Sequence, residues 1–277
     1  MSVICLLCKE REVYYIKSHL TPAGITENIY GKRNEELIYT IDAQNKNVDK
    51  YFGRDYPQNE TIEIKDAPNA RKGIFCKKCE TDFGTYEDAV QNKLNGLING
   101  IGNSTIGYKT KLEVKYSCID IHPNILITFL LSVLWRQCTE QVLDNKDNPL
   151  NLEQFEKLRN LVLENISISL KDIVQKEVIE KPKITIFSTY KSRIEPSYAN
   201  PHPKNTNPLI FFIGPIVLLY WLNDKITDEF AKITLINQNI LVDELTLDKS
   251  KIGIINQGDW RKIHNVVAKI LVKHFLE

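Results

Sequence analysis

Apolar side chains follow a helical period from about residue 79 to residue 97, where they recur every three or four positions. This spacing gathers them on one face, so the pattern predicts a helix there, with Gly84 as a point where it could be interrupted. The residues that define the apolar face are Phe83, Tyr86, Val90 and Leu94.

Three more helices are predicted further along the chain. Residues 123–143 are strongly apolar, which is typical of a buried helix. Residues 152–179 are also helical in pattern, with an interruption near 167–169. A last amphipathic helix is expected over 259–276, because a plausible N-cap aspartate precedes its apolar face.

Shorter apolar stretches predict strands. Residues 109–116 alternate charged and apolar side chains, as expected of a half-exposed strand, and 183–188 form a second candidate. The apolar run 209–222 predicts a buried strand, or two strands divided at 214–215 by Gly-Pro. A hairpin is expected over 232–242, where two apolar segments flank an Asn-Gln-Asn turn.

The N-terminal part has a different pattern. A strand over 12–16 is predicted, which delivers His19 at its end. Residues 26–70 are polar and poor in periodicity, so they are interpreted as an insertion or a long functional loop, with one candidate strand at 61–64.

A stretch rich in Gly and Asn, from residue 95 to residue 107, indicates a domain boundary. We therefore expect an N-terminal module over 1–100, with its insertion at 26–70, and a domain of mixed helices and strands over 108–277. The predicted fold class is α+β.

Composition excludes some classes of protein and leaves others open. A hydrophobic fraction of 43%, a charged fraction of 26% and a net charge of +1 are ordinary for a soluble globular chain. Nucleic-acid binding must therefore come from local patches. The apolar run 209–222 is shorter than the roughly 20 residues of a membrane-spanning helix, so no membrane insertion is expected. The N-terminus lacks the features of a secretory signal, which predicts a cytoplasmic protein.

Four of the six cysteines form two Cys-x-x-Cys pairs, Cys5 with Cys8 and Cys76 with Cys79. This spacing points two thiolates at one ion, and two such pairs complete a tetrahedral zinc site. In a reducing compartment such pairs more often bind metal than form disulfides. Four thiolates leave no open position for water, so the expected zinc is structural. The other two cysteines are expected to be small buried hydrophobes.

With these cysteine pairs, three further residues resemble the motif of the HNH endonucleases, ββα-metal enzymes with a treble-clef zinc site. In that family a zinc-knuckle Cys-x-x-Cys precedes a strand that ends in a histidine followed closely by proline. A second Cys-x-x-Cys opens the helix of the ββα fold. The matching residues besides the cysteines are His19, Pro22 and Asn69, and the match covers about the first third of the chain.

The resemblance implies a metal-dependent endonuclease that hydrolyses phosphodiester bonds of DNA, or of RNA. His19 would be the general base that activates water, a task that suits imidazole because it titrates near neutral pH. Asn69 would orient this base. A divalent ion, Mg²⁺ or Mn²⁺, would stabilise the charge that develops on the phosphate.

Two positions depart from the family pattern. Ser18 stands directly before the base, where the family usually has Asp, Glu or His as a metal ligand, and Glu80 follows the second cysteine pair, where it usually has His. A carboxylate at Glu80 suits a hard divalent cation, whereas a serine alone is a poor ligand. The alternative hypothesis is a catalytically inactive zinc module that binds nucleic acid or protein.

The cysteine pairs, together with Leu-Ser-Val-Leu-Trp-Arg at 131–136, also resemble a group of bacterial proteins described as HNH-like. An HNH-like module beside a larger domain fits an anti-phage defence effector by analogy. Nucleic acid is the expected partner, and a protein partner or a homo-oligomer is left open.

Basic residues surround the second cysteine pair. Lys72, Lys77 and Lys78 are candidate phosphate contacts, and the alternative is a solvated rim. Arg136 lies within an apolar helix, where a buried guanidinium requires a carboxylate or carbonyl partner. The sequence therefore predicts such a partner, with a structural role for Arg136.

Overall fold

The computed structural model spans the 277-residue chain. The residues that it describes are 3–13, 17–25, 37–42, 47–52, 70–98, 105–106, 115–119, 121–143, 148, 150–176, 184–188, 209–213, 216–220 and 250–254. The chain divides into two compact units, Met1–Glu80 and Thr81–Glu277. The bounds predicted from the sequence, 1–100 and 108–277, place the division later in the chain.

The first unit contains two antiparallel ribbons, each of two strands. β1 (Lys17–His19) pairs with β4 (Ala70–Lys72), and β2 (Leu37–Asp42) pairs with β3 (Asn47–Phe52). β1 ends on His19, as the sequence predicts. The strand expected just before it, over 12–16, is described only at its start, where Glu12 bridges to Ile4.

The β2–β3 ribbon lies within the segment that sequence patterning assigned to an insertion or loop. β2 does carry a strand signal, because Leu37, Tyr39 and Ile41 alternate along it. β3 begins with a polar run, Asn47 to Lys50 apart from one valine, which obscured the pairing. The tertiary pairing therefore supplies an element that periodicity missed.

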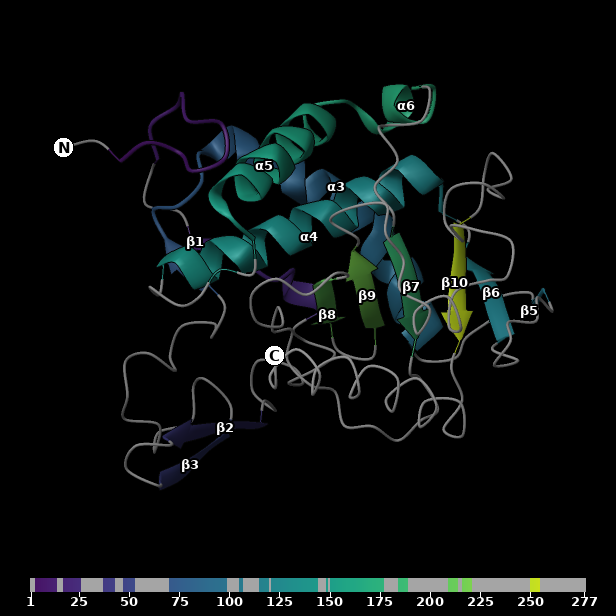
Figure 1. Ribbon diagram of the computed structural model, residues 1–277, viewed down its shortest axis with the longest axis horizontal. Helices are drawn as coiled ribbons and strands as arrows, with labels where there is room; N and C mark the ends of the chain where they lie inside the picture. The colour runs from purple at the N-terminus through teal and green to yellow at the C-terminus, as the bar shows by residue number, and fades with distance from the viewer. Residues whose placement is uncertain are drawn as a thin grey trace. The chain divides into compact units, whose positions relative to one another are not determined.

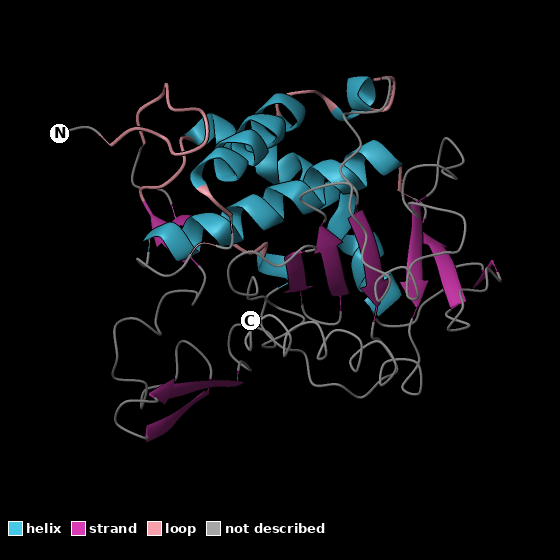
Figure 2. Ribbon diagram, viewed as in Figure 1, coloured by secondary structure: helices cyan, strands magenta, loops and turns pink. Residues whose placement is uncertain are grey.

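The second unit contains a six-stranded mixed sheet (Figures 1 and 2). Its strands are β5 (Thr105–Ile106), β6 (Lys115–Ile119), β7 (Ile184–Ser188), β8 (Leu209–Ile213), β9 (Ile216–Tyr220) and β10 (Ser250–Ile254). Their order is β5-β6-β10-β7-β9-β8. The β10–β7 pair is parallel and the other pairs are antiparallel.

Several predicted strands are confirmed in this sheet. The apolar run 209–222 forms the β8–β9 pair divided at 214–215, and 183–188 contains β7. The strand predicted over 109–116 overlaps β6 only at its end, and 109–114 lie outside the described residues.

Helices α3 (Lys77–Ile98), α4 (Pro123–Leu143), α5 (Leu152–Ile166) and α6 (Leu170–Ile173) follow the predicted pattern closely. α3 continues through Gly84, where the sequence allowed a break. Its first turn belongs to the first unit and the rest to the second.

Local capping explains why α5 and α6 are separate. Asn151 and Gln154 form a reciprocal capping box at the start of α5. Ser169 accepts a hydrogen bond from the Asp172 N–H and so begins α6. The serines predicted to interrupt the helix thus end one helix and start the next.

α4 is the core of the second unit. Its residues from 126 to 140 are buried on every side, and the helix packs against α5 and α6. On its sheet side, Cys138 lies close enough to Tyr220 of β9 that burial, with a smaller contribution from this thiol, raises the Tyr220 pKa. No helix in the described part of the chain combines the length and apolar character needed to cross a membrane.

Three sequence predictions lie outside the described residues. They are the strand at 61–64, the hairpin at 232–242 and the last helix at 259–276.

Candidate metal centre

The first cysteine pair lies in a tight turn between two short backbone segments. The Cys5 N–H donates to the Arg11 carbonyl at 2.9 Å, and the Val13 N–H donates to the Val3 carbonyl at 2.8 Å. The turn closes when the Lys9 N–H donates to the Cys5 carbonyl at 2.9 Å. Lys9 has a φ of 57°, a left-handed conformation that brings the chain back after Cys8.

The second cysteine pair spans the junction between β4 and α3. Gly73 has a φ of 75°, where only glycine turns without strain, and it reverses the chain after β4. The Ile74 carbonyl accepts the Leu6 N–H at 3.1 Å, which joins this loop to the first cysteine turn. The Glu80 N–H donates to the Cys76 carbonyl at 3.1 Å, so Cys79 lies in the first turn of α3.

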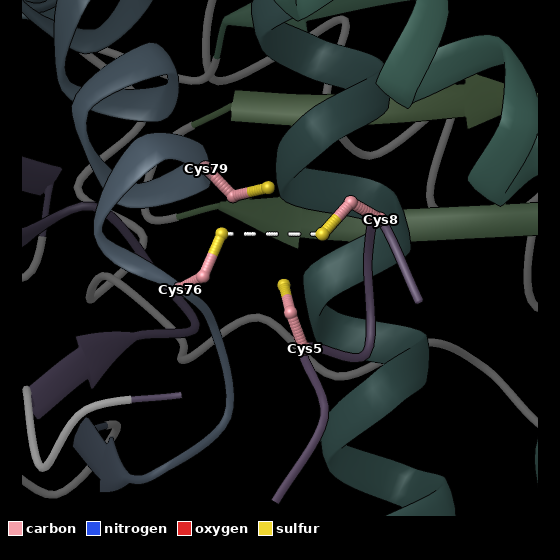
Figure 3. Close-up of side chains that lie close together, drawn as sticks. All are labelled: Cys5, Cys8, Cys76 and Cys79. Carbon is pink, nitrogen blue, oxygen red and sulfur yellow. Dashed lines mark hydrogen bonds between the residues drawn. The ribbon is translucent and has the colours of Figure 1, made fainter. Parts of the chain in front are cut away.

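The four cysteines converge on one point (Figure 3). The sulfur atoms of Cys5, Cys8, Cys76 and Cys79 all lie within 4.8 Å of one another, and each side chain is buried. The Cys8 and Cys76 sulfurs are 3.9 Å apart, and all four cysteines are free thiols rather than disulfides. A tetrahedral zinc with Zn–S bonds of about 2.3 Å holds its sulfurs about 3.8 Å apart. The tetrad could therefore hold a metal ion, and its geometry is compatible with zinc.

The surroundings of the tetrad shift the pKa values of two of its cysteines in opposite directions. The interaction with Cys79, helped by backbone N–H groups including that of Leu7, lowers the Cys5 pKa to about 4 against the effect of burial. The same interaction and burial raise the pKa of Cys79. A lowered pKa favours the thiolate, which is the form of cysteine that binds a metal ion.

Basic residues lie close to the cysteines in the sequence. The Arg11 guanidinium is hydrogen-bonded to the Cys76 sulfur, which raises the Arg11 pKa. Lys9, Lys77 and Lys78 are exposed and lie next to or between the cysteines in sequence. Four thiolates around one divalent ion leave a net charge of about −2, so these cations offset it. Arg11 was not identified from the sequence, because its contact depends on the folding of the first turn.

His19 lies at the end of β1, directly across from Ala70 of β4. Lys17 pairs with Lys72 at the next position on the same face, because side chains alternate along a strand. His19 is half-buried, whereas both lysines are exposed. The ribbon therefore presents the imidazole and two cations on one face.

Ser18 has a different environment from the one its sequence position suggests. Its side chain is 0% exposed, and its Oγ accepts the Phe75 N–H at 3.4 Å. The hydroxyl is thus turned toward the loop that leads to Cys76, on the face of β1 opposite Lys17 and His19.

The other candidate residues fall in different places. Glu80 is half-buried in the first turn of α3, and Asn69 lies outside the described residues. Within the described part of the chain, the cysteine tetrad is the one group of three or more His, Cys, Asp or Glu side chains close enough to share an ion. Lys72, Lys77 and Lys78 are all exposed, as phosphate contacts require.

Comparison of the chain with protein-family models, with curated proteins and with solved structures finds no match. A proposal for the function of this chain therefore rests on the geometry of its own residues.

Proposed function

We propose that β1, β4 and the first turn of α3 form the site of a zinc-clamped ββα nuclease that hydrolyses phosphodiester bonds of DNA or RNA, with His19 as general base. The observation that carries this proposal is the order β1, β4, α3, with His19 as the last residue of β1 and the cysteine tetrad joining the ribbon to the helix. This arrangement matches the one implied by the HNH resemblance.

In this mechanism the neutral imidazole of His19 accepts a proton from water while the water oxygen forms a bond to phosphorus. The bond from phosphorus to the leaving oxygen breaks, and that oxygen takes a proton from solvent. A divalent ion such as Mg²⁺ or Mn²⁺, held by the Glu80 carboxylate, would neutralise charge on the phosphate. The four cysteines would hold a structural zinc, which would keep β1 close to the start of α3.

The charge around His19 supports a polyanionic substrate. Lys17 and Lys72 are exposed on the His19 face of the ribbon, and Lys77 and Lys78 are exposed at the start of α3. Cations in this arrangement contact phosphates independently of base sequence. We therefore expect backbone contacts rather than base recognition from this unit.

Plasmid cleavage tests the enzyme. Purified protein with Mg²⁺ or Mn²⁺ is expected to nick supercoiled DNA, and His19→Ala is expected to reduce the rate by at least 100-fold, the lower range for loss of a general base. His122→Asn is the matched control, because His122 lies before α4 in the other unit and asparagine can replace it as a cap. Equal cleavage by His19→Ala and the parent protein would contradict the assignment.

The burial of Ser18 favours a second candidate, a zinc module that binds nucleic acid without cutting it. Ser18 stands where the family places a metal ligand, yet its hydroxyl accepts a backbone N–H inside the fold. This candidate predicts binding of labelled DNA or RNA with no cleavage in any divalent metal. Replacing Lys17 and Lys72 by Gln should then weaken binding. It should also reduce the slope of log binding constant against log salt concentration by the amount expected for about two phosphate contacts.

A further inference from the structure

Ser18 is bonded to the loop between β4 and α3 although it belongs to β1. Strand alternation places it opposite Lys17 and His19, and its 0% exposure confirms that it faces inward. Its Oγ accepts the Phe75 N–H at 3.4 Å, between residues 57 positions apart in the chain. A residue adjacent to His19 is thus attached to the residue directly before Cys76.

The same loop is also attached to the first cysteine turn. The Ile74 carbonyl accepts the Leu6 N–H at 3.1 Å, and Leu6 lies between Cys5 and Cys8. Ile74 is therefore bonded to a turn that carries two of the cysteines, and the next residue, Phe75, is bonded to β1. A change in the four sulfur positions would therefore reach, through this loop, the residue before His19.

We propose that Ser18 is a positioning residue that couples the cysteine metal centre to His19 through the Phe75 N–H. It replaces a metal ligand of the family pattern by a hydrogen-bond acceptor, so the state of the structural ion is transmitted to the end of β1. The proposal rests on the proposed function only for the task given to His19. The coupling is a property of the fold and exists whether or not the protein cleaves nucleic acid.

The size of the residue supports this role. A serine hydroxyl is small enough to be buried completely and still accept a backbone N–H. Alanine removes the acceptor and leaves the Phe75 N–H without this bond inside the fold, whereas threonine keeps the hydroxyl and suits a strand. Comparing serine, alanine and threonine at position 18 therefore separates the effect of the hydrogen bond from the effect of side-chain packing.

The test compares the full chain loaded with Zn²⁺ and with Cd²⁺, a larger ion that lengthens all four metal–sulfur bonds. The readouts are the imidazole NMR signal of His19, assigned from its absence in His19→Gln, and the hydrogen exchange of the Phe75 amide. In the parent protein, the His19 signal is expected to differ between the two metals. In Ser18→Ala that difference should fall at least twofold and the Phe75 amide should exchange at least tenfold faster, with one metal ion still bound per chain.

Two controls define the specificity of this result. Ser18→Thr should restore most of the metal-dependent His19 shift, and Thr85→Ala should leave it unchanged, because Thr85 bonds only within α3. A His19 difference of equal size in Ser18→Ala and the parent protein would overturn the proposal. The proposal would also be overturned if the Phe75 amide exchanged at the unprotected rate in the zinc-loaded parent protein. This measurement requires no variant.

Discussion

Arg136 is a buried charged side chain with several polar and aromatic contacts. It is 1% exposed, its Nη1 donates to Glu87 Oε1 at 2.6 Å, and its guanidinium lies over the Phe83 ring at 4.5 Å from the centroid. Its Nε donates to the Ser132 carbonyl at 3.3 Å. The sequence predicted a carboxylate or a carbonyl partner, and the structure shows one of each. The Glu87 carboxylate joins α4 to α3, whereas the Ser132 carbonyl belongs to α4 itself.

Removing Arg136 should therefore be strongly destabilising. We expect Arg136→Leu to lower the free energy of unfolding by about 3–5 kcal/mol, because Glu87 would keep its charge in a largely buried position without this partner. Urea unfolding followed by circular dichroism measures the change. The double variant Arg136→Leu, Glu87→Leu should recover part of the loss. A single variant within about 1 kcal/mol of the parent protein would show that the pair is not structural.

The tetrad gives a second prediction for single residues. Cys76→Ser should remove a ligand and lower the affinity for zinc by more than the roughly 10–100-fold cost of losing a group that supports a ligand. Arg11→Ala should fall within that smaller range, because it removes a cation that interacts with Cys8, Cys76 and Cys79 and leaves all four ligands in place. Competition with a chromophoric chelator measures both. Cys138→Ala is the control, because Cys138 is buried in α4 and does not belong to the tetrad. This variant should bind zinc as tightly as the parent protein.

At the scale of elements, Tyr86 holds the turn between α5 and α6 against α3. Its hydroxyl donates to the carbonyls of Asn165 at 3.0 Å and Ile168 at 2.9 Å. Tyr86→Phe removes one donor and leaves both carbonyls with one bond fewer. We expect a loss of about 1–2 kcal/mol in the free energy of unfolding, measured by urea titration. No change in stability would show that water replaces the hydroxyl at no cost.

The same tyrosine predicts a loss of stability in alkali. Burial, with a smaller contribution from Asp82, raises the pKa of Tyr86 to about 12 from an ordinary value of 10. A raised pKa means that the folded state keeps a proton which the unfolded state loses, so this contribution is present below pH 10 and disappears as pH rises to 12. Over that range the stability of the parent protein should fall more steeply than that of Tyr86→Phe, by up to about 1.4 kcal/mol per pH unit. Parallel slopes would contradict the pKa assignment.

For the whole molecule, we expect the two units to depend differently on metal. In the described part of the first unit, β1 and β4 have three residues each, and the four buried cysteines are a large share of its interior. In the second unit α4 is buried along most of its length and packs against α5. We therefore expect metal binding to contribute to the folding of the first unit, whereas the second has an apolar core of its own.

Chelation should separate the two units. After zinc removal, hydrogen exchange followed by mass spectrometry is expected to rise in peptides that cover 3–25 and 70–80, and to stay unchanged in peptides from α4. Restoring Zn²⁺ should restore protection. Equal loss of protection in α4 would show that the units do not unfold independently, and unchanged protection of 3–13 would show that the metal is not structural.

The features that the sequence predicted are the local ones. Helical period predicted α3, α4 and the interruption between α5 and α6, because the burial of one face repeats along consecutive turns. The two Cys-x-x-Cys pairs predicted the tetrad, since each turn fixes its own two ligands within four residues. The sequence also predicted that a strand over 12–16 delivers His19 at its end, and the structure shows His19 as the last residue of β1, Lys17–His19.

Contacts between distant residues were decided only by the tertiary structure. The choice of Glu87 as the partner of Arg136, 49 residues away, depends on how α3 and α4 pack, and no local pattern encodes it. The order of the strands in the sheet and the β2–β3 pairing have the same origin. Ser18 is the clearest case. From the sequence alone it stood out only as a serine at a position where the HNH pattern usually has a metal ligand. The fold turns its hydroxyl inward to the Phe75 N–H, since a buried backbone donor has to find an acceptor.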